Sequence, residues 1–290
     1  MMSPIIIFTD EPEKAGGWHG AQLATAFAAR GAEAIFASLQ DCVLDLSGDA
    51  PCIQILHVKT VPKAAFVRGI AGGTLQKITT RLNILHMLKM LGVMIYNDGK
   101  AIERTVDKAM TSFLLHQADI AIPKTWACES RSLAHQIIAQ NTQQLVIKPL
   151  FGSQGQGVRL VDTTQLPLPM DAHVDGVFYL QQFIKATHDY RVFIINNQAI
   201  AAMKRTGETW LHNAALGAHC ELTHESDVVA IALQAALVLD ISYCGVDVIR
   251  DESGKLYVLE VNSIPAWRGL QSVTDVNIAQ VLADDLLSKI

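Results

Sequence analysis

Two patterns of apolar residues divide the chain and limit its fold. Over about the first 98 residues, short apolar runs alternate with helix-like segments, as in residues 4–9, 21–31 and 74–92. Such alternation predicts a small βα domain. Beyond it, strand-like runs come in pairs around short turns, which indicates antiparallel hairpins. We therefore predict an α/β domain followed by α+β structure.

The second part of the chain begins with a predicted helix and contains a predicted hairpin. Residues 106–120 predict one helix with Val106, Met110, Phe113 and Leu114 on its apolar face. The hairpin of residues 189–205 is expected to turn at Asn196-Asn197, a dipeptide suited to positive φ.

Composition excludes several classes of protein. Half of the 290 residues are hydrophobic and 18% are charged, so a well-buried core forms easily. The net charge of −5 argues against binding to nucleic acid or to an anionic membrane. No apolar run approaches the roughly 20 residues that span a bilayer, and the start lacks the features of a signal peptide. Five scattered cysteines without a CxxC motif favour a reduced cytoplasmic protein. A homo-oligomer is compatible with all of this.

A second hairpin, residues 243–262, carries three oxygen-bearing side chains. If it turns at Glu252–Gly254, Asp247 falls roughly opposite Glu260, and Asn262 shares the side of Glu260. Clustered carboxylates repel one another unless a cation lies between them, and hard divalent ions of the magnesium type prefer such oxygens. The alternative is a solvated polar face of an edge hairpin. The Val, Leu, Ile and Tyr residues around the cluster favour the metal site.

A glycine-rich turn, "VIKPLFGSQGQGV", suggests a phosphate site. Lys148 ends an apolar run, and Gly152, Gly155 and Gly157 flank small polar residues. Glycines let backbone N–H groups approach phosphate oxygens, and lysine adds a point charge. The turn is not a Walker A loop, and it leads into a strand, unlike a dinucleotide-binding fingerprint. A hairpin turn without ligand is the alternative. Together, the glycine-rich turn and the Asp247/Glu260/Asn262 cluster predict a metal–nucleotide site between two β-structures.

The order of these motifs resembles the ATP-grasp superfamily. The resemblance covers about residues 95–275 and rests on Lys108 in "ERTVDKAMTSFLL", Lys148 with its loop, "LQQFI", "DYRVFI" and the Asp247/Glu260/Asn262 set. The RimK-like α-L-glutamate ligases are most similar. Within that branch, "GWHG" and "NSIPAWRGLQ" look most like tetrahydromethanopterin:α-L-glutamate ligases. The resemblance implies an ATP-grasp fold with a pre-grasp domain at 1–98, a central subdomain with a lid at 99–185, and a metal-bearing subdomain at 186–290.

The resemblance also implies roles for single residues. The resemblance implies that Arg205 and Lys148 are catalytic residues. It also implies that Asp247, Glu260 and Asn262 bind two ions of Mg²⁺ or Mn²⁺. The implied ATP contacts are Lys108, Lys148, Gly152, Ser153, Gln154, Gly155, Gly157, Gln181, Gln182, Phe183, Ile184, Asp189 (facing the ribose) and Asn213. The candidate substrate contacts, from loops of the first domain and from the motifs above, are Trp18, His19, Arg68, Arg191 and Arg268. Gln182 stands where the family usually has Glu, and Ala266 replaces a usual glycine.

The implied reaction is ATP-dependent ligation. A carboxylate of the acceptor becomes an acyl phosphate and is then joined to the amine of L-glutamate, on a small-molecule acceptor such as a pterin-type C1 carrier. Two alternatives stay open: a ligase acting on a peptide or protein C-terminus, and a nucleotide-binding regulatory protein without catalysis. The residues contain no convincing protein nucleophile, and acyl-phosphate chemistry needs none.

Overall fold

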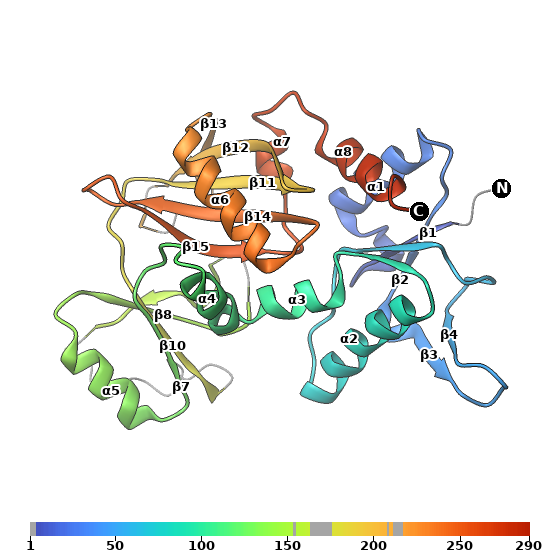
Figure 1. Cartoon of the computed structure of the whole chain (residues 1–290), viewed down its shortest axis with the longest axis horizontal. Coiled ribbons are helices and arrows are strands. Elements are labelled where there is room, and N and C mark those ends of the chain that lie inside the picture. The colour runs from blue at the N-terminus through green and yellow to red at the C-terminus, as the bar shows by residue number, and fades with distance from the viewer. Residues whose placement is uncertain (1–3, 153–154, 163–175, 208, 211–216) are drawn as a thin grey trace.

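The structure, a computed structural model, describes residues 4–152, 155–162, 176–207, 209–210 and 217–290. The described strands form three sheets and a separate hairpin. Figure 1 shows the N-terminal sheet with its helices on one side of the molecule and the other two sheets on the opposite side. Within these residues, no helix combines the length and the apolar character needed to cross a membrane.

The N-terminal part is a parallel sheet in the order β2-β1-β5-β6. Its strands are β1 (Ile5–Phe8), β2 (Ala34–Ala37), β5 (Ala64–Val67) and β6 (Met94–Tyr96). Every residue of β1 and β5 is buried, as expected for central parallel strands. The remaining elements are α1 (Gly17–Ala28), α2 (Leu75–Met90), the hairpin β3 (Cys42–Asp45) and β4 (Cys52–Ile55), and two 3₁₀ helices, Pro12–Lys14 and Leu39–Asp41.

The middle of the chain builds a four-stranded antiparallel sheet in the order β7-β10-β8-β9. The strands are β7 (Thr125–Cys128), β8 (Leu145–Lys148), β9 (Arg159–Leu160) and β10 (Phe178–Gln182). Helix α5 (Arg131–Gln140) covers one face, where Ala134 and Ile138 pack among buried side chains of β8 and β10. The sheet's other face is therefore free to line a site.

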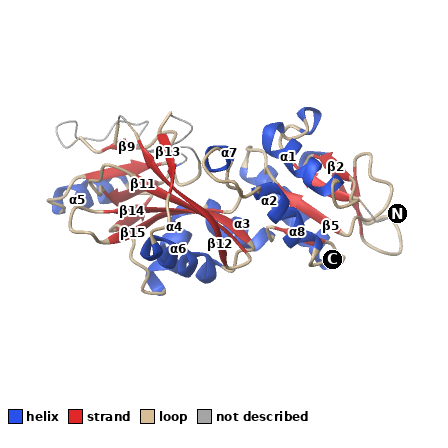
Figure 2. Ribbon diagram, turned by 90° about the horizontal axis from the view of Figure 1, so that it is seen from above, coloured by secondary structure: helices blue, strands red, loops and turns tan. Residues whose placement is uncertain are grey.

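The five-stranded antiparallel sheet follows the order β13-β12-β11-β14-β15. Its strands are β11 (Asp189–Ile195), β12 (Gln198–Thr206), β13 (His219–Leu222), β14 (Tyr243–Arg250) and β15 (Leu256–Asn262). Helices α3 (Gly99–Val106), α4 (Lys108–Gln117) and α6 (Ser226–Leu239) share one hydrophobic core with it. Figure 2 shows the sheet extending toward the N-terminal part, with α7 (Arg268–Gln271) between the two. Helix α7 contacts β12 and β13, whereas α8 (Ile278–Leu287) lies with the N-terminal part. Helix α8 packs on α1.

The helix predicted over residues 106–120 is present as α4, but its predicted start and apolar face were wrong. It begins at Lys108, because Asp107 leaves the helical conformation (φ −82°, ψ 102°) and caps α4 with its carboxylate, and Val106 is instead the last residue of α3. The restart changes the buried face of the helix. Met110 and Phe113 are exposed, whereas Thr111 and Leu115 are buried. The break also places Lys108 at the first position of α4.

The predicted fold class is confirmed, and so are both hairpin turns. Asn196 and Asn197 have positive φ, and Gly254 turns the second hairpin at φ 89°. Asp247 pairs directly with Glu260, followed by an irregularity in register. The turn thus sets which oxygen-bearing side chains face each other.

Candidate functional site

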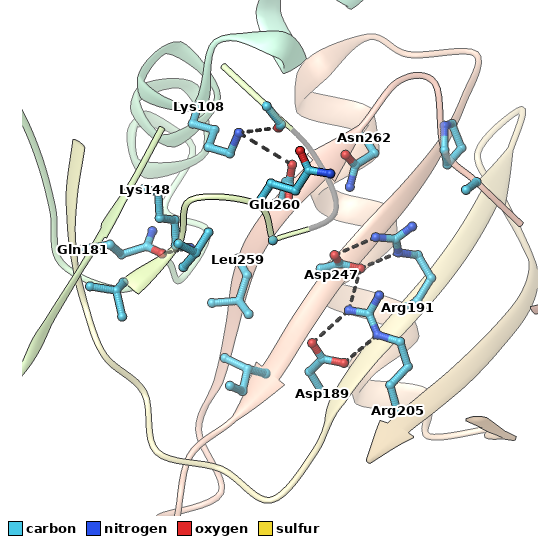
Figure 3. Close-up of a pocket in the computed structure, with 18 of the residues that line it drawn as sticks. Lys108, Lys148, Gln181, Asp189, Arg191, Arg205, Asp247, Leu259, Glu260 and Asn262 are labelled. Carbon is cyan, nitrogen blue, oxygen red and sulfur yellow. Dashed lines mark hydrogen bonds and ion pairs between the residues drawn. The ribbon is translucent and has the colours of Figure 1, made fainter. Parts of the chain in front are cut away.

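A cavity of about 640 Å³ lies between the four-stranded and five-stranded sheets. Side chains from β8, β10, β11, β12, β14 and β15 line it, and Figure 3 shows ten of its residues labelled. Its size falls within the range of small-molecule and cofactor sites.

Two lysines enter the cavity from different elements (Figure 3). Lys148 ends β8, and its Nζ donates to Gln181 Oε1 at 2.6 Å. Burial lowers the pKa of Lys148 to about 8, against the opposing effect of Glu260. Lys108 donates to the carbonyl of Gly152 at 2.7 Å, and burial also lowers its pKa. Ammonium groups with so little hydration are well suited to bind phosphate oxygens.

Glu260 and Asn262 lie beside these lysines on one side of β15. Glu260 Oε1 is 4.0 Å from Lys108 Nζ. Among the residues that the structure describes, neither Glu260 nor Asn262 has a side-chain hydrogen bond. A carboxylate and a carboxamide left without donors on a half-buried strand suit a hard cation.

Asp247, the third predicted metal ligand, is held by two arginines that sequence reasoning did not place beside it. Nε and Nη2 of Arg191 donate to its two oxygens, the second at 2.7 Å. Arg205 Nη2 lies 3.2 Å from Oδ1. Burial would raise the pKa of Asp247, but the two arginines outweigh it and lower that pKa. Asp247 is therefore an ionised carboxylate.

Arg205 also pairs with Asp189, and the four charges form an alternating row across the sheet (Figure 3). Its Nε and Nη2 donate to the two oxygens of Asp189 at 2.7 and 2.8 Å. Burial would lower the pKa of Arg205, yet Asp247 and Asp189 raise it. The predicted ribose ligand thus already has a strong protein partner.

The segment Gln181–Ile184 lines the cavity at the end of β10. The backbone N–H groups of Gln182 and Phe183 donate to the carbonyls of Lys124 and Gln144, respectively, each at 2.8 Å. Trp210, for which the sequence predicts no role, lines the same cavity. Its ring packs edge-on against that of Phe183, with 5.6 Å between the ring centroids. These side chains give this end an apolar wall suited to a flat ring.

The opposite end of the cavity is formed by the chain after β15. Pro265, Ala266, Arg268, Gly269 and Ser272 line it. Within the described part of the chain, Arg268 has no carboxylate within ion-pairing distance.

The profile of RimK-like ATP-grasp domains matches residues 105–286. The chain belongs to the RimK-like ATP-grasp family. It is 34% identical to the tetrahydromethanopterin:α-L-glutamate ligase of Methanococcus maripaludis over 78% of this chain and 79% of that protein. The probable α-L-glutamate ligase 1 of Pseudoalteromonas atlantica is 28% identical, over 92% and 90%.

Solved structures show the same fold at low identity. The ATP-grasp ligase PsnB, complexed with a minimal precursor, superposes with a TM-score of 0.76 at 19% identity, covering 100% of this chain and 99% of that one. A RimK domain protein of Sphaerobacter thermophilus gives 0.72 at 22%, covering 97% and 98%. These similarities confirm the predicted ATP-grasp fold.

Three predicted substrate contacts of this ATP-grasp chain do not line the cavity: Trp18, His19 and Arg68. The prediction that Trp18 and His19 lie in a loop was wrong, because helix α1 already begins at Gly17. His19 Nε2 accepts from the backbone N–H of Trp267 at 3.1 Å. Burial, with Arg68 and Arg268 nearby, lowers the pKa of His19 to about 4, so the ring is neutral.

Arg68 donates to the carbonyl of Pro265 at 3.0 Å and lies over the ring of Trp267. Arg68 and His19 therefore support the segment that forms the cavity's far wall. Ser153, Gln154 and Asn213 lie outside the described residues.

Proposed function

We propose that this protein is an ATP-dependent carboxylate–amine ligase that joins the carboxylate of a small-molecule acceptor to the amine of L-glutamate. One observation carries the proposal. Lys108 and Lys148 share one cavity with Glu260 and Asn262, whose oxygens have no hydrogen-bond donor among the described residues. The names of its relatives, α-L-glutamate ligases, support the choice of amino acid.

The nucleotide would span the cavity. Its base fits the apolar wall at Phe183 and Trp210, and its phosphates fit the ends of Lys108 and Lys148. The backbone around Gly152, Gly155 and Gly157 would cover the phosphates. PsnB has been crystallised with Mg and ADP.

The donor set fits a divalent cation. Glu260 and Asn262 would hold Mg²⁺ or Mn²⁺, which when bound supplies charge neutralisation for the phosphate oxygens. Asp247 would join them through oxygen lone pairs beyond those that accept from Arg191 and Arg205. The set contains two acids and an amide, which favours a hard ion over zinc.

The reaction needs positioning and charge neutralisation more than a protein nucleophile. A carboxylate oxygen of the acceptor attacks the γ-phosphorus, the bond to the bridging oxygen breaks, and ADP leaves. The glutamate amine then attacks the acyl carbon, phosphate leaves, and the nitrogen loses a proton. Lys148 and Arg205 would stabilise charge on the transferred group.

The acceptor and the amino acid are proposed to lie beyond Asn262. Arg268, which has no carboxylate partner in the described residues, would bind a substrate carboxylate there.

A screen of ADP release tests the proposal. The protein is incubated with ATP, Mg²⁺ and each amino acid, with pterin-type carboxylates or peptides as acceptors. Release is expected only when ATP, Mg²⁺, glutamate and a small carboxylate acceptor are all present. Equal release without acceptor contradicts the ligase, and activity confined to peptides replaces the small-molecule acceptor with a peptide.

A further inference from the structure

We propose that Trp18 is a positioning residue, whose ring holds the guanidinium of Arg268 at the cavity wall without neutralising it, so that Arg268 can bind a substrate carboxylate. This inference rests on the proposed function, because it takes Arg268 to be the carboxylate site of that reaction. Trp18 belongs to helix α1 of the N-terminal part. Binding of an anionic substrate would therefore depend on both ends of the chain.

Two arginines at the far end of the cavity lie on tryptophan rings. Cζ of Arg268 is 5.9 Å from the ring centroid of Trp18. Cζ of Arg68 is 4.8 Å from the ring centroid of Trp267. The two tryptophan rings pack edge-to-face, with 6.4 Å between their centroids. His19 packs edge-on against both rings and accepts from the backbone N–H of Trp267, so the five side chains form one cluster.

The rings hold these arginines in a different way from the carboxylates of the five-stranded sheet. Arg191 is neutralised by Asp247, whereas neither Arg68 nor Arg268 has a carboxylate within ion-pairing distance in the described part of the chain. An aromatic face attracts a cation but has no net charge, so the positive charge stays available. Burial, together with Arg68 and Arg268, lowers the pKa of His19 to about 4. This end of the cavity therefore attracts anions.

Only one of the two arginines is placed to contact a ligand. Arg268 is exposed and lines the cavity. Arg68 does not line it and donates to the carbonyl of Pro265, and its buried Nε has no acceptor among the described residues. Arg68 would act through its charge alone. The guanidinium of Arg268 would bind a carboxylate by two parallel hydrogen bonds.

Trp18 acts on the substrate only through Arg268, because the half-buried Trp18 does not line the cavity. An exposed arginine has many rotamers, and ligand binding must select one of them. A ring beneath the guanidinium limits these rotamers before the substrate arrives, which lowers the entropic cost of binding.

Trp18→Leu removes the ring and keeps an apolar side chain. The KM for one carboxylate substrate should rise about two- to fivefold, the size of a cation–π contact at an exposed site. The KM for ATP should change by less than about 1.5-fold, since the ring contacts no part of the nucleotide site. A rise for L-glutamate assigns the carboxylate to the amino acid, and a rise for the acceptor assigns it to the acceptor. Trp18→Phe keeps an aromatic face and should recover most of the loss.

Tyr257→Leu is the matched control. Lys255 Nζ lies 5.0 Å from the centroid of the Tyr257 ring, near the turn of the second hairpin and away from the cavity. Loss of this ring should leave the KM of every substrate unchanged.

Fluorinated tryptophans separate a cation–π contact from simple packing. Tryptophan analogues with an increasing number of fluorine atoms, incorporated at residue 18 alone, keep the shape of the ring and weaken its attraction for a cation. The KM for the carboxylate substrate should rise with each added fluorine. This series also carries the test if Trp18→Leu does not fold. In addition, Trp18→Leu combined with Arg268→Gln should bind that substrate no more weakly than Arg268→Gln alone.

A KM that does not depend on fluorination would overturn the inference, and so would multiplicative effects in the double variant. If the unaltered protein releases no ADP with any carboxylate acceptor, the proposed function fails by itself. Calorimetry with L-glutamate and with the pterin-type carboxylates then tests the inference alone. Weaker binding to Trp18→Leu than to the unaltered protein supports it, whereas equal binding or no binding to either protein overturns it.

Discussion

Lys148 is a partly buried cation whose charge depends on pH in an accessible range. Because burial lowers its pKa to about 8, the free protein carries the charge at pH 7 and loses it above pH 8. Glu260 and Asp247 favour the charged form, whereas Lys108 opposes it.

Metal-free affinity for ATP should therefore be flat below pH 8 and fall by up to about tenfold per pH unit above it, because the bound phosphates favour the protonated lysine. Calorimetric titrations from neutral to alkaline pH measure this. In Lys148→Arg, residue 148 stays charged, so ATP affinity should decrease less above pH 8. The pH dependence that is left should come from Lys108. A profile unchanged by Lys148→Arg would refute the phosphate role of Lys148.

Glu260 is the carboxylate with the clearest access to a cation. Glu260→Gln should lower kcat by at least about 100-fold, because an amide neutralises a divalent ion poorly. The circular dichroism spectrum and the melting temperature should stay unchanged. Glu252→Gln is the control, since Glu252 is exposed and pairs with Lys185 at the hairpin turn. Activity of Glu260→Gln within threefold of the unaltered protein would remove the metal assignment.

At the scale of elements, the glycine-rich hairpin between β8 and β9 depends on one close approach. Gly157 has φ 72°, and a Cβ there would lie 2.8 Å from Cγ of Pro149. Gly157→Ala should therefore distort the turn and weaken ATP binding by about tenfold or more. Gly254→Ala is the control, because Gly254 has φ 89° and no atom within 4 Å of its would-be Cβ. Equal ATP affinity in both variants would show that the turn does not shape the nucleotide site.

Local patterns predicted the hairpins well. The turn at Gly254 and the alternation of side chains place Asp247 opposite Glu260, and both follow from the sequence. The pairing of β11 with β14 does not follow from the sequence, because it brings together Arg191 and Asp247, which are 56 residues apart in the chain. For that reason the sequence does not predict the two arginines around Asp247, although it predicts separate roles for Arg191 and Arg205.

Two other differences also have physical causes. The apolar pattern does not predict that α4 begins at Lys108, because Val106 fits the same helical spacing and only capping by the Asp107 carboxylate sets the start. His19 and Arg68 were expected to meet a substrate, but they contact the chain after β15, a segment far away in sequence.

At the scale of the whole molecule, one hydrophobic core joins the two ends of the chain. Residues of β1, β5 and α1 share it with Phe193, Trp267 and helix α8. Leu282 of α8 is fully buried in this core. Leu282→Ala should lower the free energy of unfolding by about 2–5 kcal/mol.

Denaturant unfolding measures this change. Leu237→Ala is the control, because Leu237 is 65% exposed and its loss should matter little. If Leu282→Ala costs no more than Leu237→Ala, the shared core does not hold the N-terminal sheet to the rest of the chain.

In the proposed reaction, a phosphoryl group moves from ATP to a carboxylate before the amide forms. The most direct measurement uses an acceptor from the ADP-release screen with heavy oxygen in its carboxylate, followed by mass spectrometry of the phosphate released. We predict one heavy oxygen in each phosphate, because the acyl phosphate keeps that atom when the amine displaces it. Phosphate without heavy oxygen, formed together with the amide, would show that no acyl phosphate precedes the amide.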